Sequence, residues 1–200
     1  MPALHDEPGQ PGRADTRPDE EGPPSMGPAA WVRSIPVAAR DLLSGTTRCH
    51  RDLVGVELRM SDGRTYVPFR HTRRSEARWS HDHPPAVIQP RFHLEPLPPR
   101  WRRLHALFRV VCIVTTPFFV GLPGFRSKLW MVDPATGDFA GLYEWDDATT
   151  ARAYAEGLSR VLRLLSAPGS VGYELVEGTT VAEYLRRSTQ PSSTGTVDAA

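Results

Sequence analysis

The sequence predicts an α+β fold whose elements follow the order β-α-β-β-α-β between Pro84 and Leu185. Two observations lead to this prediction. Apolar residues recur at helical spacing in the segments 101–112 and 151–165, and short runs rich in β-branched and aromatic residues lie around them. This split βαβ order is the ferredoxin-like arrangement, which gives a four-stranded antiparallel sheet with both helices on one face.

A tail and a short helix precede that domain. Residues 1–28 hold seven prolines, many acidic residues and few large apolar groups, so we expect a disordered tail. The apolar spacing in Trp31–Leu43 fits an amphipathic helix that ends near Ser44-Gly45. The helix opens an extension, residues 29–83, that lies outside the ferredoxin-like domain.

The rest of the extension is predicted to form a β-hairpin and a loop. Apolar and polar residues alternate in Val54–Met60, and Asp62-Gly63 is suited to a tight turn. Thr65–Phe69 is the expected return strand, and the polar segment Arg70–His83 is expected to be loop. An isolated hairpin is marginally stable in water, so we expect this one to pack on the main domain.

The elements of the main domain, residues 84–187, follow in sequence. Ala86–Leu94 is predicted as a strand, and the prolines after it end that strand. The helix that follows is predicted from Trp101, Leu104, Ala106, Leu107, Phe108, Val111 and Cys112. The second half is predicted as strands Phe125–Val132 and Phe139–Trp145, a helix capped by Asp146 or Asp147, a strand at Val171–Val176, a short helix at Val181–Leu185 and a disordered tail, 188–200.

The predicted sheet has one face without helices of its own. The hairpin strands carry Leu129, Trp130, Tyr143 and Trp145, which make both of their faces apolar. An uncovered apolar face requires a partner, so we expect either a second copy of the chain or the N-terminal hairpin to cover it.

Composition argues against several classes of protein. The net charge of +1 and the lack of a recognised nucleic-acid motif argue against nucleic-acid binding. Val110–Leu122 is too short and too interrupted by proline to span a bilayer, which takes about 20 residues. Two cysteines and no evident signal peptide favour a reducing, cytoplasmic setting. The run His81-Asp82-His83 lacks further ligands at zinc-site spacing, so no metal is expected.

Three short motifs of the hairpin carry a resemblance to a known family. They are Pro123-Gly124-Phe125, then Lys128 with Trp130, then Gly141-Leu142-Tyr143. With the helix and strand that follow, they resemble the YdhR-type monooxygenases of the dimeric α+β barrel superfamily, over residues 84–185. The resemblance implies a homodimer whose two sheets face each other and a pocket between each sheet and its helices. It also implies oxygenation of an activated aromatic substrate without metal, flavin or other cofactor.

Candidate site residues follow from this resemblance and from side-chain chemistry. His93 and Tyr143 are the catalytic candidates, as a general base and as a hydrogen-bond donor to an oxyanion. The candidates for substrate binding are Phe119, Phe125, Arg126, Lys128, Trp130, Trp145 and Tyr154. If the strand is regular, Arg126 and Lys128 share a face with Trp130 and can attract an anionic substrate.

Each candidate also has a purely structural interpretation. The aromatic residues can form core or dimer interface, the two cations can protect an edge strand, and a single histidine on a strand is more often structural. The sequence therefore favours a cofactor-independent monooxygenase acting on a small aromatic metabolite. A non-catalytic module that binds a small molecule or a partner on the same fold is the alternative.

Overall fold

The computed structural model describes residues 28–60, 63–93, 110, 112, 114–164 and 166–189. Residues 1–27 and 190–200 of the predicted tails and most of the predicted helix 101–112 therefore lie outside the described residues, whereas residues 28, 188 and 189 are helical. The described elements are α1 (Pro28–Leu43), β1 (Thr47–His50), β2 (Leu58–Arg59), β3 (Thr65–Arg74), a 3₁₀ turn (Glu76–Arg78), β4 (Ala86–Phe92), α3 (Thr116–Val120), β5 (Phe125–Val132), β6 (Phe139–Trp145), α4 (Ala148–Leu162), β7 (Gly172–Glu177) and α5 (Val181–Thr189).

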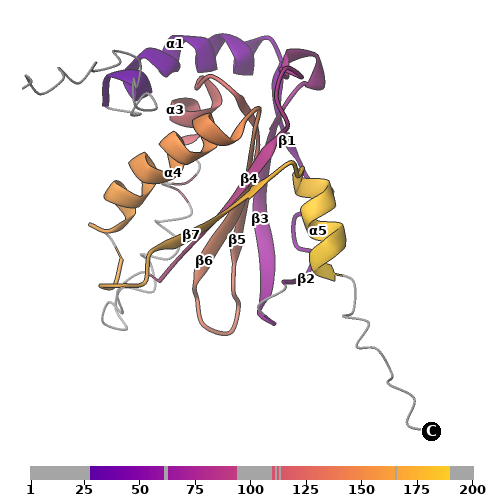
Figure 1. The fold of residues 1–200 in the computed structure, drawn as a ribbon, viewed down its shortest axis with the longest axis vertical. Coiled ribbons are helices and arrows are strands. Elements are labelled where there is room, and N and C mark those ends of the chain that lie inside the picture. Colours follow the sequence, from indigo (N-terminus) through magenta and orange to yellow (C-terminus); the bar gives the residue numbers. More distant parts are fainter. Residues whose placement is uncertain are drawn as a thin grey trace, which may run out of the picture.

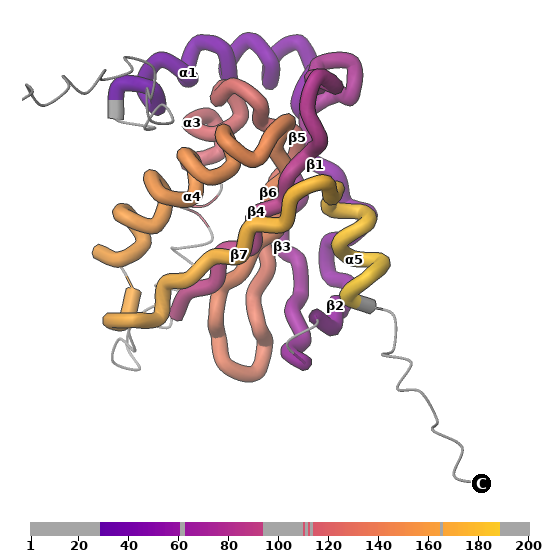
Figure 2. The backbone as a smooth tube through the Cα atoms, in the orientation of Figure 1, coloured from indigo at the N-terminus to yellow at the C-terminus, as the bar shows by residue number. Residues whose placement is uncertain are grey.

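An antiparallel sheet forms the centre of the molecule. Its strand order is β1-β3-β5-β6-β4-β7, and β2 pairs with β3 beside this path. Figure 2 traces β7 alongside β4, to which it is paired throughout. The predicted strands Phe125–Val132 and Phe139–Trp145 are confirmed at both ends, and the mixed α+β class with them. The sheet exceeds the four predicted strands, because β1 and β3 extend it beyond β5.

Helices α1, α3 and α4 cover one face of the sheet (Figure 1). Helix α4 begins where the sequence predicts, since the Asp147 side chain accepts a hydrogen bond from the Thr150 N–H at 2.7 Å. Helix α1 lies against α3, where the Ser34 hydroxyl donates to the Phe118 carbonyl at 2.6 Å. The N-terminal helix is therefore part of the layer above the sheet.

The opposite face is covered within the same chain, contrary to the prediction that it lacks helices. Helix α5 lies on this side of the sheet (Figure 1), and Tyr184 packs in the same core cluster as Leu129 and Leu142. Leu58 of the predicted N-terminal hairpin joins this cluster. Both leucines of the sheet are fully buried as a result. The homodimer that the family resemblance implies stays a prediction.

The N-terminal extension contains two further corrections. The predicted loop Arg70–His83 is wrong in its first part, because β3 continues to Arg74, and only Leu58–Arg59 of the predicted strand Val54–Met60 forms β2. Strand β3 lies between β1 and β5, so both edges of its backbone are hydrogen-bonded. This pairing makes the second half of β3 a strand despite its polar composition. The propensities of a single sequence do not predict such long-range pairing.

Candidate functional site

A pocket of about 550 Å³ opens between the helical layer and the sheet. We call it the lysine pocket, and its lining residues are Trp31, Thr115, Phe118, Phe119, Lys128, Trp130, Tyr154, Gly157, Leu158, Arg160 and Val161. They come from α1, the segment of α3, β5 and α4. Most are apolar or aromatic, and the volume falls within the range typical of small-molecule sites.

Lys128 lies on the helical side of β5, the side that Trp130 also occupies two residues later. The pairing with β6 shifts register between Phe125 and Ser127, which places Phe125 and Lys128 both on the helical side. The Lys128 residue is only 2% exposed. Its Nζ donates a hydrogen bond to the Tyr154 hydroxyl at 2.7 Å.

Aromatic rings surround the amino group of Lys128. Its Nζ lies 3.9 Å from the ring centroid of Trp130, 4.0 Å from that of Tyr143 and 4.1 Å from that of Phe119. Ring faces attract a cation, each contributing about 0.5–2 kcal/mol. An ammonium group at this position therefore meets ring faces and one hydroxyl. Within the described residues, no carboxylate forms an ion pair with it.

Burial decides the protonation of this group. Removing an ammonium group from water costs several kcal/mol, which the rings offset only in part. Burial therefore lowers the pKa of Lys128 well below its usual range, and the nearby thiol of Cys112 opposes this weakly. Burial also raises the pKa values of Tyr143 and Tyr154, so both remain protonated hydroxyls. Burial thus favours the neutral amine of Lys128 and the neutral phenol of Tyr154.

The rings of the site pack against one another and fix its shape. Tyr154 of α4 lies 4.6 Å from Trp145 and 5.5 Å from Trp31 between ring centroids, and it is stacked on the latter. Tyr143 lies 5.7 Å from Trp130, edge to face. The indole Nε1 of Trp130 is buried without a hydrogen-bond partner in the described chain.

Gly141 makes room for the Tyr143 ring. A Cβ atom at position 141 would lie 2.4 Å from Cε1 of Tyr143 and 2.9 Å from its hydroxyl oxygen. Gly141 pairs with Trp130 across the hairpin, so the ring folds over the backbone between the two strands. The motif Gly141-Leu142-Tyr143 therefore has a packing reason of its own.

The structure separates the two catalytic candidates. Tyr143 lies beside Lys128, whereas His93 lies at a second pocket of about 440 Å³ with Asp138 and Arg64. There the His93 Nδ1 is hydrogen-bonded to Asp138, and Arg64 pairs with the same carboxylate at 2.6 Å. His93 does not line the lysine pocket.

Arg126 is also removed from the pocket. The regular strand that would align Arg126 with Lys128 is not formed, because the register shift falls at this residue. Its guanidinium instead pairs with Asp146 and lies 4.9 Å from the ring centroid of Trp79. It also donates to the Ser80 carbonyl, so it ties the 79–80 segment to the sheet.

The other candidates belong to one core cluster or contact it. They are Phe119, Phe125, Lys128, Trp130, Trp145 and Tyr154. The sequence did not single out Trp31, Thr115 and Phe118. Trp31 is the first apolar residue of the predicted amphipathic helix, but no local signal connects it with Tyr154, 123 positions later. Only the docking of α1 on α3 brings them together.

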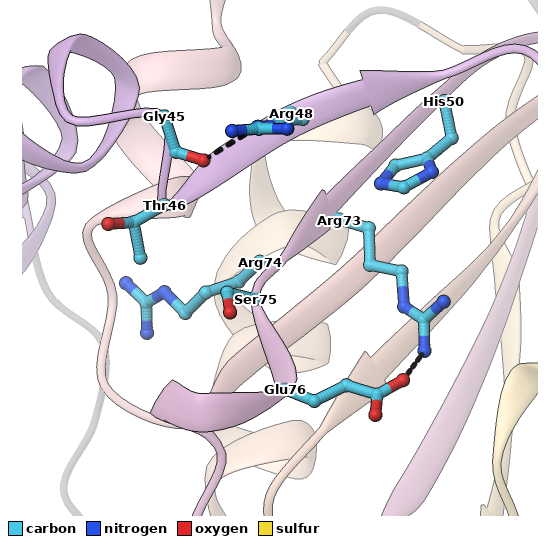
Figure 3. Close-up of a pocket in the computed structure, with 8 residues that line it drawn as sticks. All are labelled: Gly45, Thr46, Arg48, His50, Arg73, Arg74, Ser75 and Glu76. Carbon is cyan, nitrogen blue, oxygen red and sulfur yellow. Dashed lines mark hydrogen bonds and ion pairs between the residues drawn. The ribbon is translucent and has the colours of Figure 1, made fainter.

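A further pocket, at the β1–β3 edge, is lined by arginines held by neighbours (Figure 3). Arg73 pairs with Glu76, and Arg48 donates to the Gly45 carbonyl at 3.0 Å. Arg74 points away from them toward Asp41, at 3.1 Å. These contacts make the edge an intramolecular polar network.

Within the described ranges, no three or more histidine, cysteine, aspartate or glutamate side chains form a group suited to a metal ion. None of the helices in that part of the chain has the length and apolar character needed to cross a membrane.

No family model matches the chain, and no curated protein matches it. Among solved structures, it is similar to LmHde, a heme-degrading enzyme from Listeria monocytogenes, with a TM-score of 0.39 and 12% sequence identity. That similarity covers 58% of this chain and 72% of the other. A likeness this distant carries no argument about function, which rests on the residues described above.

Proposed function

We propose that this chain is an oxidative enzyme, a cofactor-independent monooxygenase that acts on a small aromatic molecule in the lysine pocket. The observation that carries the proposal is the buried amino group of Lys128, enclosed by aromatic rings and bonded to Tyr154. An amine with a depressed pKa is a base near neutral pH. Such a pocket suits a substrate whose acidic group is a phenolic hydroxyl on a flat ring.

The chemistry begins with the transfer of a proton. Lys128 removes the proton of a phenol or hydroquinone, and the ammonium group so formed stabilises the phenolate at short range in a dry site. The Tyr154 hydroxyl is placed to donate a second hydrogen bond to that oxygen. The aromatic walls hold the substrate ring flat and in one orientation.

The electron-rich anion then reacts with oxygen. For a hydroquinone, one oxygen atom enters the ring to give a hydroxyquinone, and the other leaves as water. The substrate supplies all four electrons, so the protein has to deprotonate it, orient it and exclude water. The side chains of the lysine pocket are suited to each of these tasks.

The arrangement of the sheet supports the same proposal. The strand order β5-β6-β4-β7 with α4 on one face is consistent with the ferredoxin-like unit that we propose. The lysine pocket lies between this sheet and its helices, where the resemblance to barrel monooxygenases implies a substrate site.

Oxygen consumption with 1,4-naphthalenediol as the probe tests the proposal. We expect catalysed uptake in the wild type and a loss of about 10²–10⁴-fold in Lys128→Met, the range typical of general-base catalysis. Arg152→Met, which removes a half-exposed cation from α4, is the matched control and should retain activity. Loss of activity in His93→Ala but not in Lys128→Met would contradict the assignment of the base. Quenching of tryptophan fluorescence without oxygen uptake would instead identify a binding module.

A further inference from the structure

The amino group of Lys128 can act as a nucleophile as well as a base. Its side chain lines an apolar pocket while its residue is 2% exposed, so the amino group meets a ligand only at the inner end of the pocket. An unprotonated amine is a nucleophile toward carbonyl carbon, and desolvation is one of the ways in which proteins activate lysine. Burial lowers the pKa of Lys128, which supports the unprotonated state.

We propose that the lysine pocket captures aromatic aldehydes as an imine on Lys128. The aldehyde ring would lie among the aromatic walls formed by Phe119, Trp130 and Trp31, with its carbonyl directed to Nζ. This inference rests on the ligand pocket of the proposed function but requires no oxygen.

The reaction balances without a further reactant. The Nζ lone pair forms a bond to the carbonyl carbon, and the electron pair of the C=O π bond moves to oxygen. After proton transfer from nitrogen to oxygen, the carbinolamine loses its hydroxyl group as water while the C=N bond forms. The products are one imine and one water molecule, with no change of oxidation state overall.

Tyr154 is positioned to assist the proton transfers. Its hydroxyl oxygen lies 2.7 Å from Nζ, so it contacts the atom at which the carbinolamine forms. Because burial raises the pKa of Tyr154, the hydroxyl stays protonated, and it can hydrogen-bond the leaving oxygen and relay a proton from nitrogen to it. No other tyrosine hydroxyl within the described chain is hydrogen-bonded to this amine.

The composition of the chain makes the adduct easy to assign. Lys128 is its only lysine, so the amino terminus is the only other primary amine of an untagged protein. Reduction of an imine with borohydride converts it into a stable secondary amine. The modified residue is then identified by the intact mass and by peptide mapping.

The test incubates the folded, untagged chain with 4-hydroxybenzaldehyde and borohydride. We expect one adduct on Lys128, formed at least tenfold faster than that on the amino terminus, and absent in Lys128→Met. Tyr154→Phe should slow the adduct at least tenfold. Tyr184→Phe is the matched control, because it loses a buried hydroxyl bonded to Gln89 on the other face of the sheet, and its labelling rate should equal that of the wild type.

A second measurement needs no variant and therefore does not depend on how variants fold. The ratio of Lys128 labelling to amino-terminal labelling in the folded wild type is compared with the ratio in urea. We expect the ratio to fall on unfolding, since the pocket is then lost. An equal or lower ratio in the folded chain would overturn the proposal. Fluorescence quenching by the aldehyde without an adduct would overturn the imine but retain the pocket, and the absence of both would count against the proposed function as well.

Discussion

The amino group of Lys128 lies 2.7 Å from the hydroxyl of Tyr154, and the two side chains come from opposite layers of the fold. Lys128 projects from the central strand β5, and Tyr154 from the sheet-facing side of α4. Both are buried, with aromatic rings around them. A polar pair in such surroundings lowers stability unless it is well satisfied, so its presence points to chemistry.

Replacement of Lys128 by methionine should stabilise the protein near neutral pH. A lysine whose pKa is lowered on folding binds fewer protons in the folded state than in the unfolded state, so wild-type stability rises with pH between the folded pKa and about 10.4. We expect Lys128→Met to be more stable by on the order of 1–4 kcal/mol near neutral pH. The difference should shrink as pH rises toward about 10.4.

Urea unfolding at several pH values measures that difference. Arg152→Met is the control, because its cation lies half-exposed beside Glu177 and should change stability by less than about 0.5 kcal/mol at any of these pH values. A Lys128→Met variant that is less stable than the wild type near neutral pH would show that the ammonium form is the one that the rings stabilise.

Replacement of Trp31 by alanine should weaken binding of an aromatic ligand. The Trp31 ring lines the lysine pocket and stacks on Tyr154, and aromatic pairs contribute about 0.5–1.5 kcal/mol beyond simple burial. We therefore expect the dissociation constant for 1-naphthol, measured by fluorescence quenching, to rise roughly two- to tenfold. Val32→Ala on the exposed side of the same helix should leave it unchanged. Equal dissociation constants for 1-naphthol in the two variants would show that α1 does not contribute to the ligand site.

Substitution of Gly141 by alanine should destabilise the fold by about 1–3 kcal/mol, as overpacking does. The new methyl group would meet the Tyr143 ring, which is itself packed against Trp130. Gly172→Ala is the matched control in another strand, since a Cβ there meets nothing within 4 Å. If thermal unfolding shows both variants to be equally stable, the Tyr143 ring does not lie over Gly141.

Substitution of Gly121 by alanine should displace α1 from the helical layer. A Cβ at position 121 would lie 1.9 Å from the carbonyl oxygen of Ser34, and a backbone carbonyl in a helix cannot move aside cheaply. We expect faster amide hydrogen exchange in α1 and weaker ligand binding, while the strands β5 and β6 keep their protection. Unchanged exchange in α1 would contradict its close packing on α3.

The mass of the protein in solution tests whether a second copy of the chain packs on the sheet face that α5 and β2 cover. Leu129 and Leu142 are already fully buried beneath Tyr184 and Leu58, so this face leaves little apolar surface for another copy. A mass of about 22.2 kDa in light scattering would show that the cover within the chain takes the place of a second copy. A mass twice as large would support the homodimer that the family resemblance implies.

The central hairpin and α4 were predictable from the sequence because their signals are local. Alternating apolar residues, turn residues and the cap at Asp147 act over short distances. The second half of β3 was not predictable, because His71 and its polar neighbours form a strand only through pairing with β1 and β5.

Of the candidates named from the sequence, the lysine pocket is lined by Phe119, Lys128, Trp130 and Tyr154, but their arrangement was not predictable. The register shift in β5 removes Arg126 from the face that Lys128 shares with Trp130, and nothing in the local sequence predicts this shift. The place of Trp31 depends on the docking of two helices far apart in the chain. The burial that lowers the pKa of Lys128 is likewise a property of the assembled layers.

The most direct test of the central claim is the protonation of Lys128 itself. Because this lysine is the only one in the chain, protein grown with ¹³Cε-labelled lysine gives a single lysine signal in a ¹H–¹³C correlation spectrum. Its chemical shift is followed with pH in the folded protein. We expect a midpoint well below the value of about 10.4 for a lysine in water. A midpoint at or above about 10.4 would contradict the unprotonated amine on which the proposed chemistry depends.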